Sequence, residues 1–273
     1  MVIFFTMITG MTEDKTIISF ANISANYDGK HDVLSDVSFN ISNGAFYFLT
    51  GASGAGKTTL LRLIYQLHQP SSGTIRLFGQ DCHGLSRNDI SSLRHKMAIV
   101  FQGYSLISHM TVFDNVALPL RVRGVPNDKI KKLVTKTLEW VGLGKYAKAF
   151  PMELSGGQQQ RVSVARAIII QPEILLADEP TGNLDDENAS RLMELFVQMN
   201  KMFGTTIILA THNKKLLETY KFPVITVDNH HVSFSSANDK KTFSGEHTRQ
   251  WKGPQPQNYF ADLSKQLEEI GKA

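Results

Sequence analysis

Short apolar runs and helical stripes alternate along this chain after a first part that is rich in predicted strands. Three β-prone runs with turn residues between them come first, and three apolar runs that suit buried strands follow later. The six runs are residues 17–20, 37–41, 74–78, 97–101, 174–177 and 206–210. Because the later runs alternate with helical stretches, the pattern predicts an α/β fold with a largely parallel sheet covered on both faces.

Helical spacing is strongest in the middle of the chain. One apolar stripe is formed by Ile130, Leu133, Val134, Leu138 and Val141, and it ends at Gly142. A second stripe is formed by Leu192, Leu195, Phe196, Met199 and Phe203. Helices and loops dominate between about residues 87 and 158, so we predict an inserted helical subdomain there.

Composition sets limits on the remaining possibilities. The 273 residues are 42% apolar and 20% charged, which is typical of a globular protein with a substantial core. A formal net charge of +4 permits contact with a membrane surface or a nucleic acid but does not argue for either. The single cysteine, Cys82, excludes an internal disulfide and a thiolate zinc cluster.

The two ends of the chain are expected to lie outside the main domain, which we place at residues 17–232. Residues 1–16 form an N-terminal extension whose apolar part is too short to span a bilayer, and Met11 is a candidate for the true start. Residues 233–273 begin as a polar linker and end in a short amphipathic stripe. That stripe suits a helix on its own domain, on a partner or on a membrane, with the first favoured because its charges are mixed in sign.

A glycine-rich loop between residues 50 and 60 matches the phosphate-binding pattern G-x-x-x-x-G-K-[ST]. An apolar strand at residues 45–50 precedes it, and a predicted helix, marked by apolar residues up to Leu67, follows it until Pro70. Glycines let successive N–H groups face phosphate oxygens, the lysine supplies positive charge, and the hydroxyl that follows can bind Mg²⁺. The loop consists of Gly51, Ala52, Ser53, Gly54, Ala55, Gly56, Lys57, Thr58 and Thr59. The sequence therefore predicts a site for a nucleoside triphosphate.

Polar residues follow three of the predicted strands. Asp178 and Glu179 end one apolar run, His212 follows the next, and Gln102 follows an earlier one. A lone acidic pair at a strand end is more often simply solvated, but ligands bind at the carboxyl ends of parallel strands, where the phosphate loop also lies. We expect Asp178 to hold Mg²⁺, Glu179 to accept a proton from attacking water, and His212 and Gln102 to contact phosphate, metal or water.

A second anion cradle precedes another predicted helix. Ser155, Gly156, Gly157 and Gln158 follow Leu154, and an apolar helix begins soon after them. One phosphate loop already serves one nucleotide, so a second cradle requires a separate explanation. The pentapeptide Leu-Ser-Gly-Gly-Gln resembles the signature of ATP-binding-cassette (ABC) ATPases.

The other motifs of ABC ATPases are present in the family's order. By this resemblance Gln102 is the glutamine of the Q-loop, Asp178 and Glu179 are the Walker B pair, Asp185 is the D-loop aspartate, and His212 is the switch histidine. Tyr27 stands where the family has an aromatic residue that stacks on adenine, and an ordinary strand aromatic is the less favoured alternative. The resemblance implies a P-loop ATPase domain with an antiparallel β subdomain and a helical subdomain.

The family also implies an assembly and a reaction. Two such domains bind two ATP molecules, each between the phosphate loop of one protomer and the signature of the other. This chain is therefore expected to pair with a second copy of itself or with a relative, and the pair of identical copies is the simpler case. ATP and Mg²⁺ are the expected cofactors, and hydrolysis is expected to use Glu179 as the base. A separate integral-membrane permease is the expected partner, so the chain would lie peripherally on the cytoplasmic face of the plasma membrane. No nucleic acid partner is expected.

The branch of the family can be narrowed by two further stretches. Residues 177–185 resemble the branch of lipoprotein releasers, macrolide exporters and bacterial cell-division ATPases, and residues 111–120 are most similar to the cell-division type, whose permease is FtsX. Gly103 and Gln159 depart from that pattern, because an acidic residue is usual at the first and frequent at the second. An ATPase of an exporter stays open as an alternative, as does, less favoured, a soluble nucleotide-gated clamp on nucleic acid or ribosomes.

Overall fold

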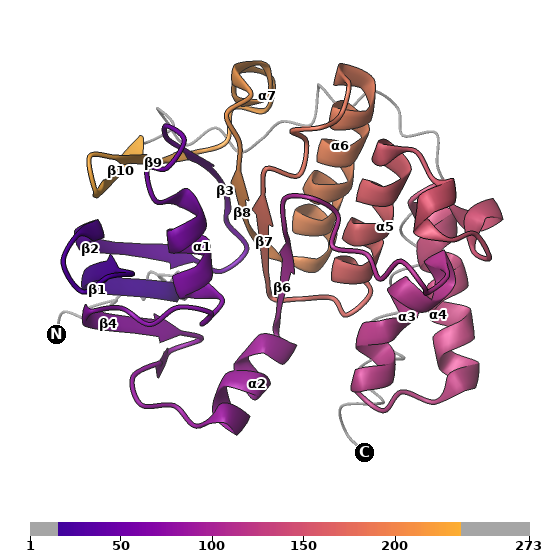
Figure 1. The fold of residues 1–273 in the computed structure, drawn as a ribbon, viewed down its shortest axis with the longest axis horizontal. Helices are drawn as coiled ribbons and strands as arrows, with labels where there is room; N and C mark the ends of the chain where they lie inside the picture. The colour runs from indigo at the N-terminus through magenta and orange to yellow at the C-terminus, as the bar shows by residue number, and fades with distance from the viewer. Residues whose placement is uncertain (1–15, 236–273) are drawn as a thin grey trace, which may run out of the picture.

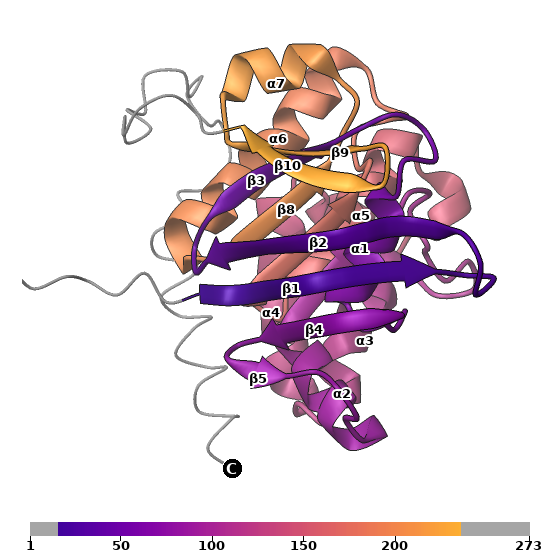
Figure 2. The ribbon, with the colours of Figure 1, turned by 90° about the vertical axis from the view of Figure 1, so that its left-hand side faces the viewer.

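The computed structural model describes residues 16–235, which form two sheets and the helices packed on them (Figure 1). The first sheet has four antiparallel strands in the order β2-β1-β4-β5. It holds all three β-prone runs predicted at the start of the chain, and Figure 2 shows its strands lying side by side. Its strands are β1 (Thr16–Asn26), β2 (Asp32–Ser42), β4 (Ser72–Leu77) and β5 (Gln80–Asp81).

The second sheet has six strands in the order β10-β9-β3-β8-β7-β6. Its strands from β9 to β6 are parallel, and β10 pairs antiparallel with β9 at the edge. The parallel arrangement predicted from the alternation of strands and helices is confirmed. The strands are β3 (Phe46–Thr50), β6 (Met97–Val100), β7 (Ile174–Asp178), β8 (Thr206–Ala210), β9 (Val224–Asp228) and β10 (His231–Ser235).

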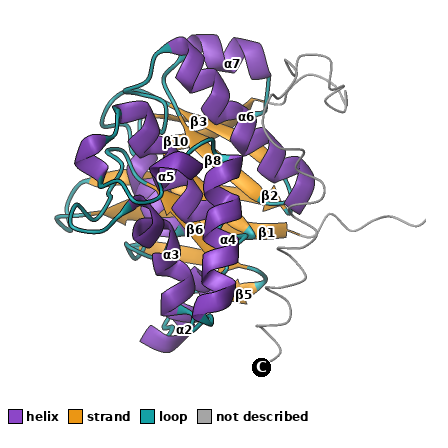
Figure 3. Cartoon of the chain, turned by 90° about the vertical axis from the view of Figure 1, so that its right-hand side faces the viewer, coloured by secondary structure: helices purple, strands orange, loops and turns teal. Residues whose placement is uncertain are grey.

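Helices cover the two faces of the parallel sheet differently. Helix α1 (Lys57–Ile64) lies between the two sheets, so its apolar residues are buried on more than one side (Figure 1). The opposite face is covered by α5 (Gly156–Ile168) and α6 (Asp186–Phe203), with α3 (Val112–Val122) and α4 (Asn127–Trp140) packed beyond α5 (Figure 3). The remaining elements are α2 (Arg87–His95), α7 (Lys214–Tyr220) and the 3₁₀ turns η1 (Gly144–Tyr146) and η2 (Pro151–Glu153).

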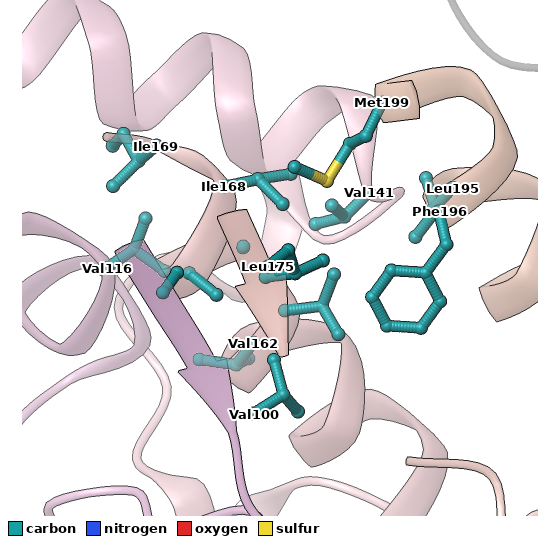
Figure 4. Packing of buried hydrophobic residues seen from close by; sticks show 14 of the residues in the cluster. Val100, Val116, Val141, Val162, Ile168, Ile169, Leu175, Leu195, Phe196 and Met199 are labelled. Atoms are coloured by element: carbon teal, nitrogen blue, oxygen red, sulfur yellow. The ribbon is translucent and has the colours of Figure 1, made fainter. Parts of the chain in front are cut away.

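Two apolar cores hold the parallel sheet between them. Successive residues of a strand point to opposite faces, so Leu175 of β7 packs in the core with α3–α6, whereas Leu176 packs in the core with α1 and the antiparallel sheet. Strands β7 and β8 are buried along their whole length. In Figure 4, Leu175 lies among Val162 of α5 and Phe196 of α6. This double burial explains why these strands read as continuous apolar runs.

The structure differs from the sequence-based expectation at three boundaries. Strand β10 continues to Ser235 and pairs with β9 along its whole length, so residues 233–235 belong to the sheet and not to the predicted linker. Helix α1 ends at Ile64 and does not reach Pro70, because Gln66 takes a left-handed conformation with φ 57°, and Leu67 is 47% exposed. The predicted helical subdomain, about residues 87–158, includes β6, which pairs with β7 in the parallel sheet. A strand that belongs to the core therefore lies inside the stretch predicted to be an insert, between α2 and α3.

The N-terminal extension up to residue 15 and the chain beyond residue 235 lie outside the described residues, and with them the candidate start at Met11 and the predicted C-terminal helix. Within residues 16–235, none of the helices combines the length and the apolar character that crossing a membrane requires.

Candidate functional site

The phosphate loop joins β3 to the N-terminus of α1, as the sequence predicts. Gly51 has φ 145°, and a Cβ atom there would lie 2.3 Å from the carbonyl oxygen of Val227, so only glycine fits. Lys57 is the first residue of α1 and is 8% exposed. Its ammonium donates to the carbonyl oxygens of Gly51 at 2.8 Å and Ala52 at 2.9 Å, so its charge is held across the loop.

A cavity of about 450 Å³ opens on this loop. It lies at the carboxyl ends of the parallel strands, where open α/β sheets bind ligands. The structure brings Gln102, Asp178, Glu179 and His212 together at its wall, although they are spread over more than a hundred residues of the chain. The cavity is lined by Gly51, Ser53, Gly54, Gly56, Lys57, Thr58, Thr59, Gln102, Asp178, Glu179 and His212.

Oxygen ligands for a cation meet at one side of the cavity. Thr58 is the second residue of α1, and Asp178 is the last residue of β7. The hydroxyl of Thr58 donates to Oδ2 of Asp178 at 2.8 Å. Hydroxyl and carboxylate oxygens are ligands that Mg²⁺ prefers, and Mg²⁺ is usually bound by one or two such groups together with substrate phosphates. The donor set at this position therefore fits Mg²⁺.

A carboxylate and an imidazole lie beside these ligands. Oε2 of Glu179 is 2.9 Å from Nδ1 of His212, and the two residues follow the neighbouring strands β7 and β8. Glu179 has φ 47°, a left-handed conformation that is costly for a residue with a side chain. Its backbone N–H donates to the carbonyl oxygen of Ala210 at 3.0 Å, which helps to hold that conformation. A carboxylate oriented in this way can accept a proton from water in the cavity.

The second anion cradle lies outside this cavity. Ser155 caps the N-terminus of α5, because its hydroxyl accepts from the N–H of Gln158 and the Gln158 side chain accepts from the N–H of Ser155. The first turn of α5 carries no acidic residue, so its helix dipole stays available to an anion. Neither Ser155 nor the two glycines that follow it belong to the lining of the phosphate cavity.

Asp185 also lies outside the cavity, beside the second cradle. It caps α6, and its carboxylate accepts from the N–H and the side-chain amide of Asn188, at 2.8 Å each. These hydrogen bonds hold the pKa of Asp185 below its usual value. A Cβ atom on Gly157 would lie 3.3 Å from the Asn188 side chain, so the N-termini of α5 and α6 are neighbours. Ser155 and Asp185, predicted to be the signature serine and the D-loop aspartate, cap these two neighbouring helices.

The segment after Gln102 connects the cavity to the second cradle through contacts with α5. The Tyr104 hydroxyl would lie 2.6 Å from a Cβ atom on Gly156, so it rests against the first residue of α5. Arg166, also on α5, donates to the carbonyl oxygen of Ser105 at 2.8 Å. Burial lowers the pKa of Arg166. No periodic pattern in the sequence marks these contacts.

Tyr27 stands at the end of β1 and is 55% exposed. Its hydroxyl lies 3.2 Å from the hydroxyl of Thr59, which lines the cavity. One face of its ring stacks on His68, with ring centroids 4.4 Å apart and planes inclined by 26°. The ring is therefore held next to the phosphate loop, and its stacking on adenine stays a prediction.

Comparisons with known proteins agree with this geometry. Residues 34–182 match the family model described as ABC transporter. The cell division ATP-binding protein FtsE of Escherichia coli K12 is 42% identical over 216 residues, which is 79% of this chain and 97% of that protein. This chain belongs to the ABC transporter family. As an ABC ATPase it binds ATP and hydrolyses it.

Two further relatives define the breadth of the similarity. The methionine import ATP-binding protein MetN of Carboxydothermus hydrogenoformans is 40% identical over 218 residues, which is 79% of this chain and 65% of that protein. Among solved structures, the ABC cassette MJ0796, described as a dimer in a post-hydrolysis state with ADP and Pi, is 29% identical with a TM-score of 0.76. The similarity covers 82% of this chain and all of that cassette, so the ABC ATPase fold predicted from the motifs is confirmed.

Proposed function

We propose that this chain is the ATP-binding subunit of a membrane ABC complex of the cell-division type and that it works as a homodimer on a separate permease. The similarity to FtsE carries the proposal, since the alignment covers 97% of FtsE but 65% of MetN. The permease would resemble FtsX, and the complex would regulate cleavage of septal peptidoglycan. The chain would then lie peripherally on the cytoplasmic face of the plasma membrane.

The residues of the cavity divide the work of hydrolysis. Lys57 and the N–H groups of the phosphate loop hold the triphosphate, and Thr58 and Asp178 are placed to hold Mg²⁺, which when bound neutralises charge that develops on the phosphate oxygens. Glu179 takes the proton from the attacking water. His212, 2.9 Å from Glu179, orients that carboxylate and the water, and Gln102 contributes an amide to the same wall.

The position of the second cradle supports the homodimer. Ser155 and the glycines after it present an uncompensated helix N-terminus away from the cavity of their own protomer. A second copy, rotated by a two-fold axis, would place its Ser155 against the triphosphate of the first. The dimeric MJ0796 cassette shows that a chain with a similar fold can assemble in pairs.

An ABC ATPase of a transporter is the second candidate. Identity to MetN is close to that to FtsE, which favours an import complex as the competing assignment within the same chemistry. The exporter branch of lipoprotein releasers and macrolide exporters shares the same motif around Asp178 and Glu179. The cargo, or the absence of one, depends on which permease binds the chain.

The test is capture of the partner by a protein that binds ATP but does not hydrolyse it. Glu179→Gln removes the proposed base and should trap the ATP-bound dimer, so tagged variant and Mg-ATP are added to detergent-solubilised membranes. Glu218→Gln, an exposed residue of α7, is the matched control, and it should hydrolyse ATP and elute as the wild type does. Recovery of an FtsX-like permease supports the proposal. An import or export permease, or nucleic acid without any membrane protein, would overturn the cell-division assignment.

A further inference from the structure

The ring of Tyr27 packs against His68, a residue that belongs to none of the motifs described above. His68 stacks on one face of the ring at 4.4 Å between centroids. The Tyr27 hydroxyl contacts Thr59 on α1, so the ring is held both at its face and at its tip. With 55% of the residue still exposed, the ring keeps accessible surface next to the cavity.

The unusual end of α1 puts His68 in this position. The chain leaves the helix at Gln66, whose φ is 57°, and the N–H of Leu67 turns back to the carbonyl oxygen of Arg62 at 2.8 Å. This turn directs His68 towards the end of β1, where Nε2 lies 2.9 Å from the carbonyl oxygen of Asn26, the residue before Tyr27. Had the helix continued to Pro70, as the apolar spacing predicts, His68 would lie elsewhere.

A flat aromatic ring held by contacts at one face and at its hydroxyl is suited to stacking on another flat ring. Nucleobases stack on aromatic side chains through their π-faces, and such stacking favours binding most when the ring is already oriented. Thr59 belongs both to the cavity lining and to the contacts of Tyr27, so a base attached to a triphosphate in the cavity can reach the ring.

We propose that His68 is a positioning residue that fixes Tyr27 as the stacking platform for the nucleotide base. The inference rests on the proposed binding of ATP in the phosphate cavity. His68 should increase the affinity for ATP through the contact of the base with Tyr27 and should not affect the contacts of the phosphates. His68 itself touches Tyr27 and Asn26 and lies outside the lining of the cavity.

The two contributions are separated by comparing ATP with inorganic tripolyphosphate, which has the phosphates but no base. Dissociation constants of both, with Mg²⁺, are measured by titration calorimetry on the full chain. His68→Ala should weaken ATP binding about 3- to 10-fold, a part of the stacking effect of one base, and leave tripolyphosphate binding unchanged. His68→Phe, which keeps an aromatic ring behind Tyr27, should restore most of the affinity for ATP. Leu67→Ala, the exposed neighbour, is the control and should change neither constant.

A double-mutant cycle tests whether His68 acts through Tyr27. Tyr27→Ala should weaken ATP binding by roughly 10- to 100-fold, and adding His68→Ala to it should have no further effect. Equal loss for ATP and tripolyphosphate in His68→Ala would overturn the proposal, because it would mean that the substitution disturbs the phosphate loop. Full additivity of the two substitutions would overturn it as well. Failure of the cell-division assignment is distinguishable, because it would leave ATP and tripolyphosphate binding unchanged; a wild type that binds neither ligand would overturn the assignment of the cavity as the triphosphate site.

Discussion

Asn115 offers a quantitative test of how the segment between the cavity and the helical subdomain is held. The residue lies on α3, is completely buried, and its Oδ1 accepts from the N–H of Ile107 at 2.8 Å. Its amide group donates to the carbonyl oxygens of Ile107, Met110 and Thr111 at 3.0–3.1 Å. The side chain of Asn115 therefore joins the loop that follows Gln102 to the start of α3 by hydrogen bonds.

Replacing Asn115 with alanine removes one acceptor and two donor hydrogens at this buried position. The two amide hydrogens are shared among three carbonyl oxygens, so they count as two hydrogen bonds, and the bond that Oδ1 accepts is the third. At about 1 kcal/mol for each of the three, the expected loss is about 3 kcal/mol of unfolding free energy. That corresponds to about a hundredfold change in the ratio of folded to unfolded protein. The Ile107 amide, which bonds to the Asn115 side chain, should lose protection against hydrogen exchange by a comparable factor.

The assay is urea unfolding together with hydrogen exchange, with Asn127→Ala as the control. Asn127 is exposed at the start of α4, so its substitution should change the unfolding free energy by less than about 0.5 kcal/mol. A loss below about 1 kcal/mol for Asn115→Ala would refute the reasoning. So would unchanged protection of the Ile107 amide, since the loop would then be held by other contacts.

Three further outcomes follow from the site and the cores. Gly51→Ala, whose Cβ would lie 2.3 Å from the carbonyl oxygen of Val227, should weaken ATP binding more than tenfold by calorimetry; unchanged binding would contradict the close approach. Thr58→Val keeps the shape of the side chain but removes the donor to Asp178, so the Mg²⁺ concentration for half-maximal hydrolysis should rise; an unchanged value would remove Thr58 from the metal site. Burial raises the pKa of Cys82 to about 11 from 9.0. The neutral thiol therefore contributes unfolding free energy in full below about pH 9, and this contribution is lost as the pH rises towards 11. In urea unfolding, the unfolding free energy of Cys82→Ala should fall less over this pH range than that of the wild type.

The core sheet was predictable because buried parallel strands carry a strong signal. Strands β7 and β8 are apolar on both faces, and the runs at residues 174–177 and 206–210 match them closely. The end of α1 was not predictable, since Leu67 continues the apolar spacing although the chain has already left the helix at Gln66. The periodicity of apolar residues predicts which residues could face a core, but it does not predict where the backbone leaves the helix.

The site also has a part that was predictable from the sequence and a part that was not. Residues that follow parallel strands, such as Asp178 and His212, could be brought together from the sequence, because the carboxyl ends of such strands meet at one edge. The contacts of Tyr27 with His68 and of Tyr104 with Gly156 join residues far apart in the chain without any shared pattern. Such contacts depend on the directions of side chains in loops, and these directions cannot be predicted from a single sequence.

The two anion-binding elements of this chain are mechanically joined, and this bears on how a dimer would work. Gln102 lies in the wall of the cavity, and the residues directly after it are attached to α5, the helix that begins with the signature. The attachment is made at two points: the Tyr104 hydroxyl rests against Gly156, and Arg166 donates to the carbonyl oxygen of Ser105. Because a half-buried guanidinium that loses its acceptor costs free energy, a shift of this segment should move α5 with it rather than break the contact. A change at one triphosphate would then reach the signature that faces the other.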